Sequence, residues 1–157
     1  MERRQLSARI SPFSGEAMPL LLGIIGPKGS GKSSLAKAII QQLDDPRMGA
    51  RIAFARPIKA MVRTLLMESG IKYPSPHTNG TKKEEPIDGF PAEVTARSLM
   101  QTLGTEWGRE HVDEDIWVSI GVNKGRKARS QGKIAVIDDV RFPNEVKAIR
   151  WHGGSII

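Results

Sequence analysis

Residues 20–34 read LLLGIIGPKGSGKSS, and this stretch decides the fold of the chain. An apolar run that predicts a buried strand leads into the spacing Gly-x-x-x-x-Gly-Lys-Ser, and helix-like sequence follows it. The glycines Gly26 and Gly31 let successive backbone N–H groups turn inward and surround anionic oxygens. An accidental glycine-rich turn is the weaker interpretation because a strand precedes the segment and a helix follows it. The stretch therefore predicts a phosphate-binding loop for a nucleoside triphosphate.

The polar residues of this loop have expected partners on the nucleotide. Lys32 is expected to reach the β- and γ-phosphates, and the Ser33 hydroxyl is expected to bind Mg²⁺. The N-terminus of the following helix carries partial positive charge toward the same place. The residues expected to contact the nucleotide are Gly26, Lys28, Gly29, Ser30, Gly31, Lys32, Ser33 and Ser34.

Composition limits the class of protein. The chain has 157 residues, enough for one domain with one core, and it has no cysteine, which excludes disulfide scaffolds and thiolate metal sites. The longest apolar run, around residues 18–25, is too short to cross a bilayer, and no secretory core follows the N-terminus. We therefore expect a cytosolic protein.

The formal net charge of +7 raises the question of nucleic-acid binding. The basic residues are spread along the chain, and aromatic residues make up only 5%, so stacking platforms for single strands are scarce. We favour a positive cleft that binds several phosphates. Residues 1–17 lack sustained periodicity and are expected to form a flexible extension before a single domain at 18–157.

The remaining chain predicts alternating strands and helices. The strand at 20–25 is apolar at nearly every position and is expected to be central in the sheet. Residues 70–91 predict a structureless loop that is either a functional lid or disordered, Gly104 and Gly108 are expected to interrupt a helix, and 125–133 predicts a basic turn. The expected strands are 20–25, 51–55, 134–137 and 155–157. One helix is expected to follow the loop and end near 43, a second to start at 57, a third to cover 92–103, a fourth to start near 113 or 115, and a last one to cover 143–150.

Charged residues suggest the chemistry beyond the loop. The strand at 134–137 runs into Asp138 and Asp139, a place where a carboxylate can hold Mg²⁺, although two solvated acids at a strand end would look the same. If the bound triphosphate transfers a phosphoryl group to an acceptor that is itself a phosphate, the acceptor site needs arginines, because a guanidinium binds phosphate oxygens bidentately. Trp107 is a candidate for packing a nucleobase. The candidate arginines are Arg56, Arg63, Arg97, Arg109 and Arg141.

Three segments together resemble a known family. They are residues 54–59 (FARPIK), 99–109 (LMQTLGTEWGR) and 139–145 (DVRFPNE), and they are similar to the deoxynucleoside monophosphate kinases of bacteriophages and prophages. The resemblance implies a P-loop kinase fold, a parallel sheet wrapped by helices with a mostly helical acceptor-binding insertion at 56–112. It also implies transfer of the γ-phosphoryl group of ATP, with Mg²⁺, to a deoxynucleoside monophosphate.

The resemblance assigns residues to this expected site. It places Lys59, Arg97, Gln101 and Arg109 in the acceptor pocket, where Trp107 is the further candidate. It places Asp139 and Arg141 at the catalytic strand end. Together with the loop motif, this makes Lys32, Asp139 and Arg141 the catalytic candidates and Ser33 and Asp139 the candidate metal ligands. Of the two neighbouring acids, Asp139 is expected to face the cleft together with Arg141, because side chains alternate along a strand.

The sequence departs from the family pattern at two places. Arg56 stands where an aspartate is commoner, and members normally continue beyond the position of Ile157 through a basic lid, a helix and a last strand, so the chain is expected to be truncated. Alternatives therefore stay open: a P-loop kinase of another phosphorylated small molecule, a catalytically impaired nucleotide-binding prophage remnant, or a nucleic-acid binder. The sequence is compatible with a homodimer and leaves the oligomeric state open.

Overall fold

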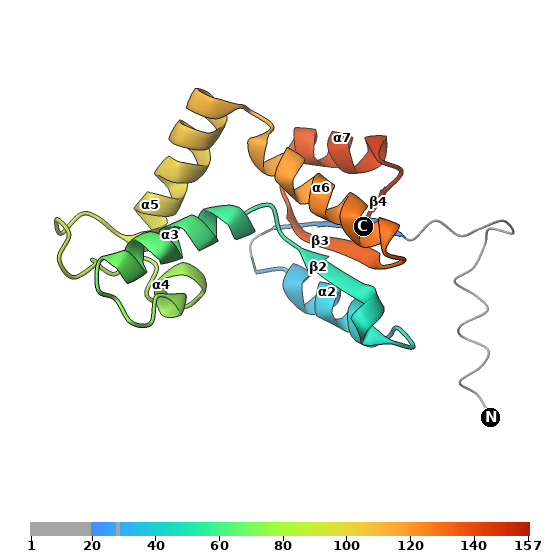
Figure 1. The fold of residues 1–157 in the computed structure, drawn as a ribbon, viewed down its shortest axis with the longest axis horizontal. Coiled ribbons are helices and arrows are strands. Elements are labelled where there is room, and N and C mark those ends of the chain that lie inside the picture. The colour runs from blue at the N-terminus through green and yellow to red at the C-terminus, as the bar shows by residue number, and fades with distance from the viewer. Residues whose placement is uncertain (1–19, 28) are drawn as a thin grey trace, which may run out of the picture.

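The computed structural model of the chain describes residues 20–27 and 29–157, which build a parallel sheet with helices on both faces (Figure 1). The predicted extension at 1–17 lies outside the described residues. The strands are β1 (Leu21–Ile25), β2 (Gly49–Ile52), β3 (Ile134–Val140) and β4 (Ser155–Ile156). Their spatial order is β2-β3-β1-β4, and each neighbouring pair is parallel. All carboxyl ends therefore meet at one edge, where open α/β sheets bind ligands.

Strand β1 is central, as its continuous apolar sequence predicts. Leu21 pairs with Ala135 of β3 on one side, and Leu22 pairs with Ser155 of β4 on the other. Leu21 is fully buried and Ile24 is 2% exposed. Burial of side chains of this size contributes about 1.5–3 kcal/mol each, which holds the strand that leads into the loop in place.

The two faces of the sheet are covered by different helices. Helix α2 (Lys32–Gln41) packs against Ile24 and Val136 through its buried Ala36. Helices α6 (Ile116–Ser130) and α7 (Pro143–Trp151) cover the face that carries Ile137. Val136 and Ile137 are neighbours on β3, so their side chains point to opposite faces. Among the residues that the structure describes, no helix is long and apolar enough to cross a membrane.

A helical lobe lies beside the sheet (Figure 1). It consists of α3 (Arg56–Glu68), α4 (Ser75–Asn79), α5 (Ala96–Thr102) and the π-helical segment η2 (Leu103–Val112). The lobe has its own small core of Val62, Leu66, Ile87 and Ala96. Val62 and Leu66 belong to the apolar stripe that predicts helix α3, and both are buried. Packing among its own residues therefore contributes to the shape of the lobe.

Residues 70–91 are not structureless. They contain α4, and Ile87 is 1% exposed in the core of the lobe. Pro86 forms an isolated antiparallel bridge with Thr95. The prediction of a long structureless loop is therefore wrong, because Ile87, with the partly buried Ile71 and Phe90, packs into the core of the lobe.

Several predicted boundaries also differ: the helix expected from 92 begins at Ala96, and the strand expected to end at 137 continues to Val140. The second strand covers 49–52 rather than 51–55, and a short 3₁₀ turn, η1 (Pro46–Met48), precedes it. Helix α6 continues to Ser130, so the predicted turn at 125–133 is mostly helix. The absence of a side chain at Gly125 lets α6 approach the sheet, since a Cβ there would lie 3.0 Å from the Leu21 side chain.

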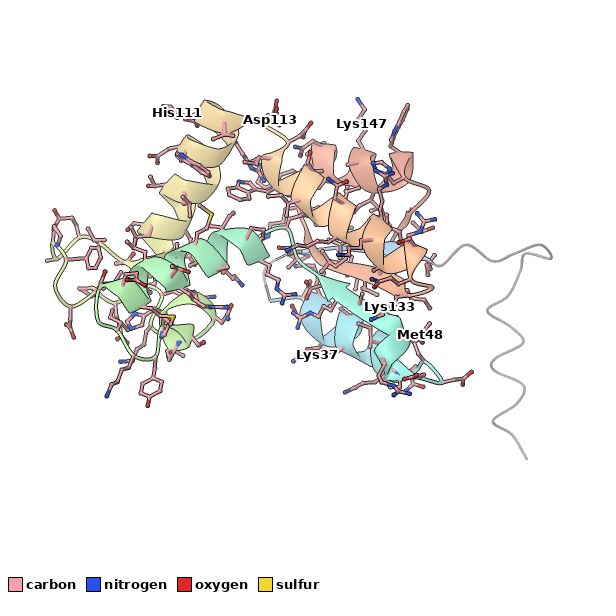
Figure 2. All side chains as sticks on the ribbon, viewed as in Figure 1. Lys37, Met48, His111, Asp113, Lys133 and Lys147 are labelled. Atoms are coloured by element: carbon pink, nitrogen blue, oxygen red, sulfur yellow. The ribbon has the colours of Figure 1, made fainter. Side chains whose placement is uncertain are left out.

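Gly104 and Gly108 do not interrupt the helix that contains them. They lie inside η2, which continues α5 without a break and ends at Val112, shortly before the turn that contains Asp113 (Figure 2). Both glycines are buried. A Cβ at Gly104 would meet Ile58 at 3.1 Å, and one at Gly108 would meet the Trp117 ring at 2.5 Å. Their role is therefore to let neighbouring side chains pack against the helix backbone.

Candidate functional site

The predicted phosphate-binding loop joins β1 to α2 at the carboxyl edge of the sheet. Gly29 and Gly31 have φ angles of 85° and 81°, which residues with side chains rarely adopt. Gly31 is also the N-cap of α2, so the first turn of this helix points its free N–H groups into the loop. Lys28 lies outside the described residues. The loop therefore combines left-handed glycines with a helix N-terminus, the two features that favour anions.

The Lys32 side chain folds back over its own loop. Its ammonium group donates to the carbonyl oxygens of Gly26 at 2.6 Å and Pro27 at 2.5 Å. The same group lies 3.4 Å from the Ser30 hydroxyl. These carbonyl contacts hold the Lys32 ammonium beside the backbone N–H groups of the loop. A phosphate would bind between the ammonium and these N–H groups.

Two adjacent acids at the end of β3 face the same space with different partners. Asp138 is 3% exposed, and its Oδ2 accepts from Arg51 Nε at 2.8 Å. Asp139 accepts from the backbone N–H groups of Phe54 at 2.8 Å and Ala55 at 2.9 Å. Burial raises the pKa of Asp139 above its ordinary value, and these two hydrogen bonds oppose that rise. The carboxylate of Asp139 thereby fixes the turn between β2 and the helical lobe.

Lysines and arginines from the lobe approach this acidic edge. Arg97 on α5 forms an ion pair with Glu84, whereas Lys59 on α3 is partly buried. Burial lowers the pKa of Lys59, the nearby charge of Lys83 lowers it further, and Asp139 opposes the shift. The site therefore concentrates positive charge that an anionic ligand would stabilise.

Arg109 links the lobe to helix α7. Its guanidinium lies 4.0 Å from the centroid of the Phe142 ring, and its Nη2 is 3.4 Å from Glu145 Oε1. Glu145 is 2% exposed and accepts from the backbone N–H groups of Arg141 at 2.6 Å and Phe142 at 3.0 Å. Burial raises the pKa of Glu145, and the two N–H donors oppose the shift. Glu145 thus caps the N-terminus of α7 and also faces an arginine of the lobe.

One cavity of about 660 Å³ brings these groups together. The loop contributes one wall, the lobe contributes another, and the end of β3 with the start of α7 forms the floor. Of the predicted site residues, the cavity is lined by Gly29, Ser30, Gly31, Lys32, Ser33, Ser34, Lys59, Arg97, Arg109, Asp139 and Arg141.

The other predicted residues do not line this cavity. Gly26 lies behind the loop and accepts from Lys32. Gln101 is exposed on α5. Trp107 is 43% exposed and packs against Trp117 with ring centroids 6.2 Å apart. It is Trp117 that lines the cavity, and its Nε1 donates to the Gly104 carbonyl at 2.7 Å. A nucleobase contact of Trp107 stays a prediction without support from this arrangement.

Two of the five candidate arginines also lie elsewhere. Arg56 is exposed at the start of α3, and Arg63 donates to the buried Thr78 hydroxyl at 2.9 Å. The expectation that only one of the two acids faces the cleft differs from the structure, since both Asp138 and Asp139 line the cavity. This is because the cavity lies beyond the end of the sheet rather than on one face of it.

Sequence reasoning missed Lys83, Arg51 and Glu145, which also line the cavity. Lys83 stood in a charged run that predicted only a loop. Arg51 stood within a predicted strand. Glu145 had a detectable signal, because an acidic residue three positions after the residue that precedes a helix, here Phe142, is typical of a cap.

Comparison with known proteins identifies relatives of this chain. A sequence model of the family "Deoxynucleotide monophosphate kinase" matches residues 68–157. The deoxynucleoside-5'-monophosphate kinase of Escherichia phage T5 is 27% identical over 185 residues, covering 85% of this chain and 72% of that protein. A relative from Acanthamoeba polyphaga mimivirus, whose name also contains the words deoxynucleotide monophosphate kinase, is 28% identical over 150 residues, covering 88% of this chain and 72% of its own length.

The resemblance carried by residues 54–59, 99–109 and 139–145 is therefore confirmed at the level of the family. The fold agrees with it, because the parallel four-stranded sheet flanked by helices is the expected P-loop kinase architecture. More than half of the chain matches the family model, and so this chain belongs to the deoxynucleotide monophosphate kinase family.

Proposed function

We propose that this chain transfers the γ-phosphoryl group of ATP to a deoxynucleoside monophosphate and forms the diphosphate. One observation supports the proposal: the loop with Lys32 and a cluster of lobe cations line one cavity. A protein that binds a single phosphate compound would need only one of these groups. Two groups of phosphate-binding residues in one cavity suit a donor and an acceptor held in line for transfer.

The donor phosphates would lie in the loop. Lys32 donates to two backbone carbonyls, which hold its charge within the loop. Phosphate oxygens would take over these hydrogen bonds, and the attraction would be stronger because the acceptor as well as the donor would then be charged. Ser30, Ser33 and Ser34 line the same wall and offer hydroxyl groups to the phosphates or the metal.

The acceptor phosphate would bind between the lobe and the floor of the cavity. We assign this role to Lys59, Arg97, Arg109 and Arg141, all of which line it, and we assign the lobe at 56–112 as the acceptor-binding insertion. The acceptor oxygen already carries charge, so the reaction needs no general base. It needs positioning and neutralisation of charge, which these cations provide.

The residues present fit a Mg²⁺ ion. Ser33 and the acids Asp138 and Asp139 line the same cavity and offer hard oxygen atoms. Among residues 20–27 and 29–157, no group of three or more histidine, cysteine or acidic side chains could by itself hold a metal. This suits magnesium, which is usually held by one or two protein oxygens, phosphates and water. We propose Ser33 and Asp139 as its protein ligands, and the ion would neutralise charge on the transferred phosphoryl group.

A coupled assay tests this function directly. Purified protein, ATP, Mg²⁺ and each of the four deoxynucleoside monophosphates should give a diphosphate product with at least one acceptor. Protein that binds ATP but converts none of them would reject the proposal for this chain. A thermal-shift screen separates the second candidate, a kinase of another phosphorylated small molecule, since only the first predicts stabilisation by deoxynucleotides.

A further inference from the structure

Arg109 reaches the cavity from the lobe and is held there by two residues of another element. The Phe142 ring lies under its guanidinium at 4.0 Å, and the Glu145 carboxylate lies at its edge at 3.4 Å. Both holding residues belong to the start of α7, on the sheet side of the cavity. An arginine side chain has many rotamers, so contacts from two directions restrict where its guanidinium can point.

Glu145 itself cannot move easily. Its Oε2 accepts from the N–H groups of Arg141 and Phe142, so Oε1 is left to face Arg109. The carboxylate is 2% exposed, and the adjacent Asn144 is held by a hydrogen bond of 2.8 Å to Asp115. The start of α7 is therefore fixed before any ligand arrives. Because one oxygen is bonded to the backbone, the carboxylate of Glu145 presents its other oxygen to Arg109 from a fixed position.

We infer that Glu145 is a positioning residue, which together with the Phe142 ring holds the Arg109 guanidinium in the orientation that binds the acceptor phosphate. The inference rests on the proposed function. Glu145 uses one oxygen for the backbone and the other for Arg109, so it joins the strand end to the lobe across the acceptor site. A guanidinium that is already oriented loses less conformational freedom when the phosphate binds.

An opposite effect of Glu145 has to be weighed. A carboxylate beside a phosphate site repels the phosphate, and this term alone predicts tighter acceptor binding when the charge is removed. Two backbone N–H groups and the guanidinium already compensate the charge of Glu145. The expected net effect of removing it is therefore weaker binding, because the orientation of Arg109 is lost while little repulsion is relieved.

The test is the affinity for each deoxynucleoside monophosphate, measured by calorimetry in the presence of a non-hydrolysable ATP analogue. Glu145→Gln keeps an oxygen for the backbone caps but presents an amide to Arg109. We expect about tenfold weaker acceptor binding, the loss expected for one hydrogen bond to a charged group. Affinity for the ATP analogue should stay unchanged. Glu110→Gln, an exposed neighbour of Arg109 outside the cavity lining, is the matched charge control.

A double-mutant cycle separates positioning from a structural role. In an Arg109→Ala background, Glu145→Gln should change acceptor affinity by less than about twofold, because its partner is gone. Phe142→Leu, at a residue that is 44% exposed, should weaken the acceptor without loss of folding. Equal losses for donor and acceptor, additive effects in the cycle, or tighter acceptor binding would each overturn the inference. Wild-type protein that binds no deoxynucleotide would overturn the proposed function as well, whereas unchanged variants of a binding-competent protein overturn the inference alone.

Discussion

The guanidinium of Arg51 lies 2.6 Å from the carboxylate of Asp138, across the carboxyl ends of β2 and β3. Asp138 is buried, so this pairing compensates a charge that would otherwise be costly. Its neighbour Asp139 has a different environment, because two backbone N–H groups occupy its oxygens. The two acids are adjacent in sequence and line one cavity, but the charge of one is compensated by a cation and that of the other by peptide dipoles.

This difference makes the proposed metal ligand testable. Asp139→Asn should weaken ATP binding more in Mg²⁺ than without metal, because it removes the charge, whereas the loss of one of the two hydrogen bonds from Phe54 and Ala55 acts with or without metal. Asp138→Asn is the matched variant, and it should mainly release Arg51. Calorimetry of ATP binding with and without Mg²⁺ compares the two. If the Asp138 variant loses the dependence on metal and the Asp139 variant keeps it, the metal ligand is Asp138.

Lys32 gives a second prediction. Lys32→Ala should weaken ATP binding about 10- to 100-fold, as expected for loss of a hydrogen-bonding partner of a charged group. The lysine bonds only within its own exposed loop, so the free energy of unfolding should change by less than about 0.5 kcal/mol. Lys37→Ala, on an exposed position of the same helix, is the control (Figure 2). An ATP affinity equal to that of the unmodified protein would show that the loop does not bind triphosphate.

The pKa of Asp139 yields a pH dependence. Burial raises this pKa above its ordinary value of 3.8, so between 3.8 and the raised value the folded protein binds more protons than the unfolded chain. The contribution of Asp139 to stability is therefore largest at low pH and falls as pH rises through that window. Urea unfolding of the wild type and of Asp139→Asn over pH 3.5–7 should show the wild type losing stability relative to the variant as pH rises, about in the range where buried carboxyls titrate. If the stability of the wild type relative to Asp139→Asn instead rises with pH, the two backbone hydrogen bonds outweigh burial in setting the pKa of Asp139.

Much of the sheet could be predicted from the sequence because its signals are local. The run at 20–25 is apolar throughout, and the structure confirms it as the central strand β1. Helix α3 was predicted from its stripe, in which Val62 and Leu66 are buried. The prediction of a structureless loop at 70–91 was wrong because the burial of Ile87 depends on packing against the rest of the lobe, and this packing leaves no pattern within the segment itself.

The candidate site was predictable where a motif or a resemblance fixed it. The loop residues and Arg97, Arg109, Asp139 and Arg141 line one cavity, although nothing local in the sequence says that α5 and β3 meet. Partners that come from other elements were not predictable. Arg51 opposite Asp138 follows from the parallel register of β2 with β3, in which Arg51 pairs with Val136, and a register is invisible in one sequence.

The π-helical segment η2 provides the last prediction. Gly104 and Gly108 lie in the same segment, so replacing either with alanine gives the same gain in helix propensity, about 1 kcal/mol. Their surroundings differ. A Cβ at Gly104 would meet the tip of Ile58 at 3.1 Å, and this flexible methyl can move aside. A Cβ at Gly108 would lie 2.5 Å from the ring of Trp117, which is 2% exposed and cannot retreat while its Nε1 donates to the Gly104 carbonyl.

Gly108→Ala should therefore lower the free energy of unfolding by about 1–3 kcal/mol, the usual cost of overpacking a core. Gly104→Ala should change it by less than about 1 kcal/mol, because helix propensity offsets a mild contact. Urea unfolding followed by tryptophan fluorescence measures both, and Trp117 reports on the site of the change. Trp117 also lines the cavity, so Gly108→Ala should weaken acceptor binding as well as stability. Equal stability of the two variants would mean that Trp117 is not packed against η2 in solution.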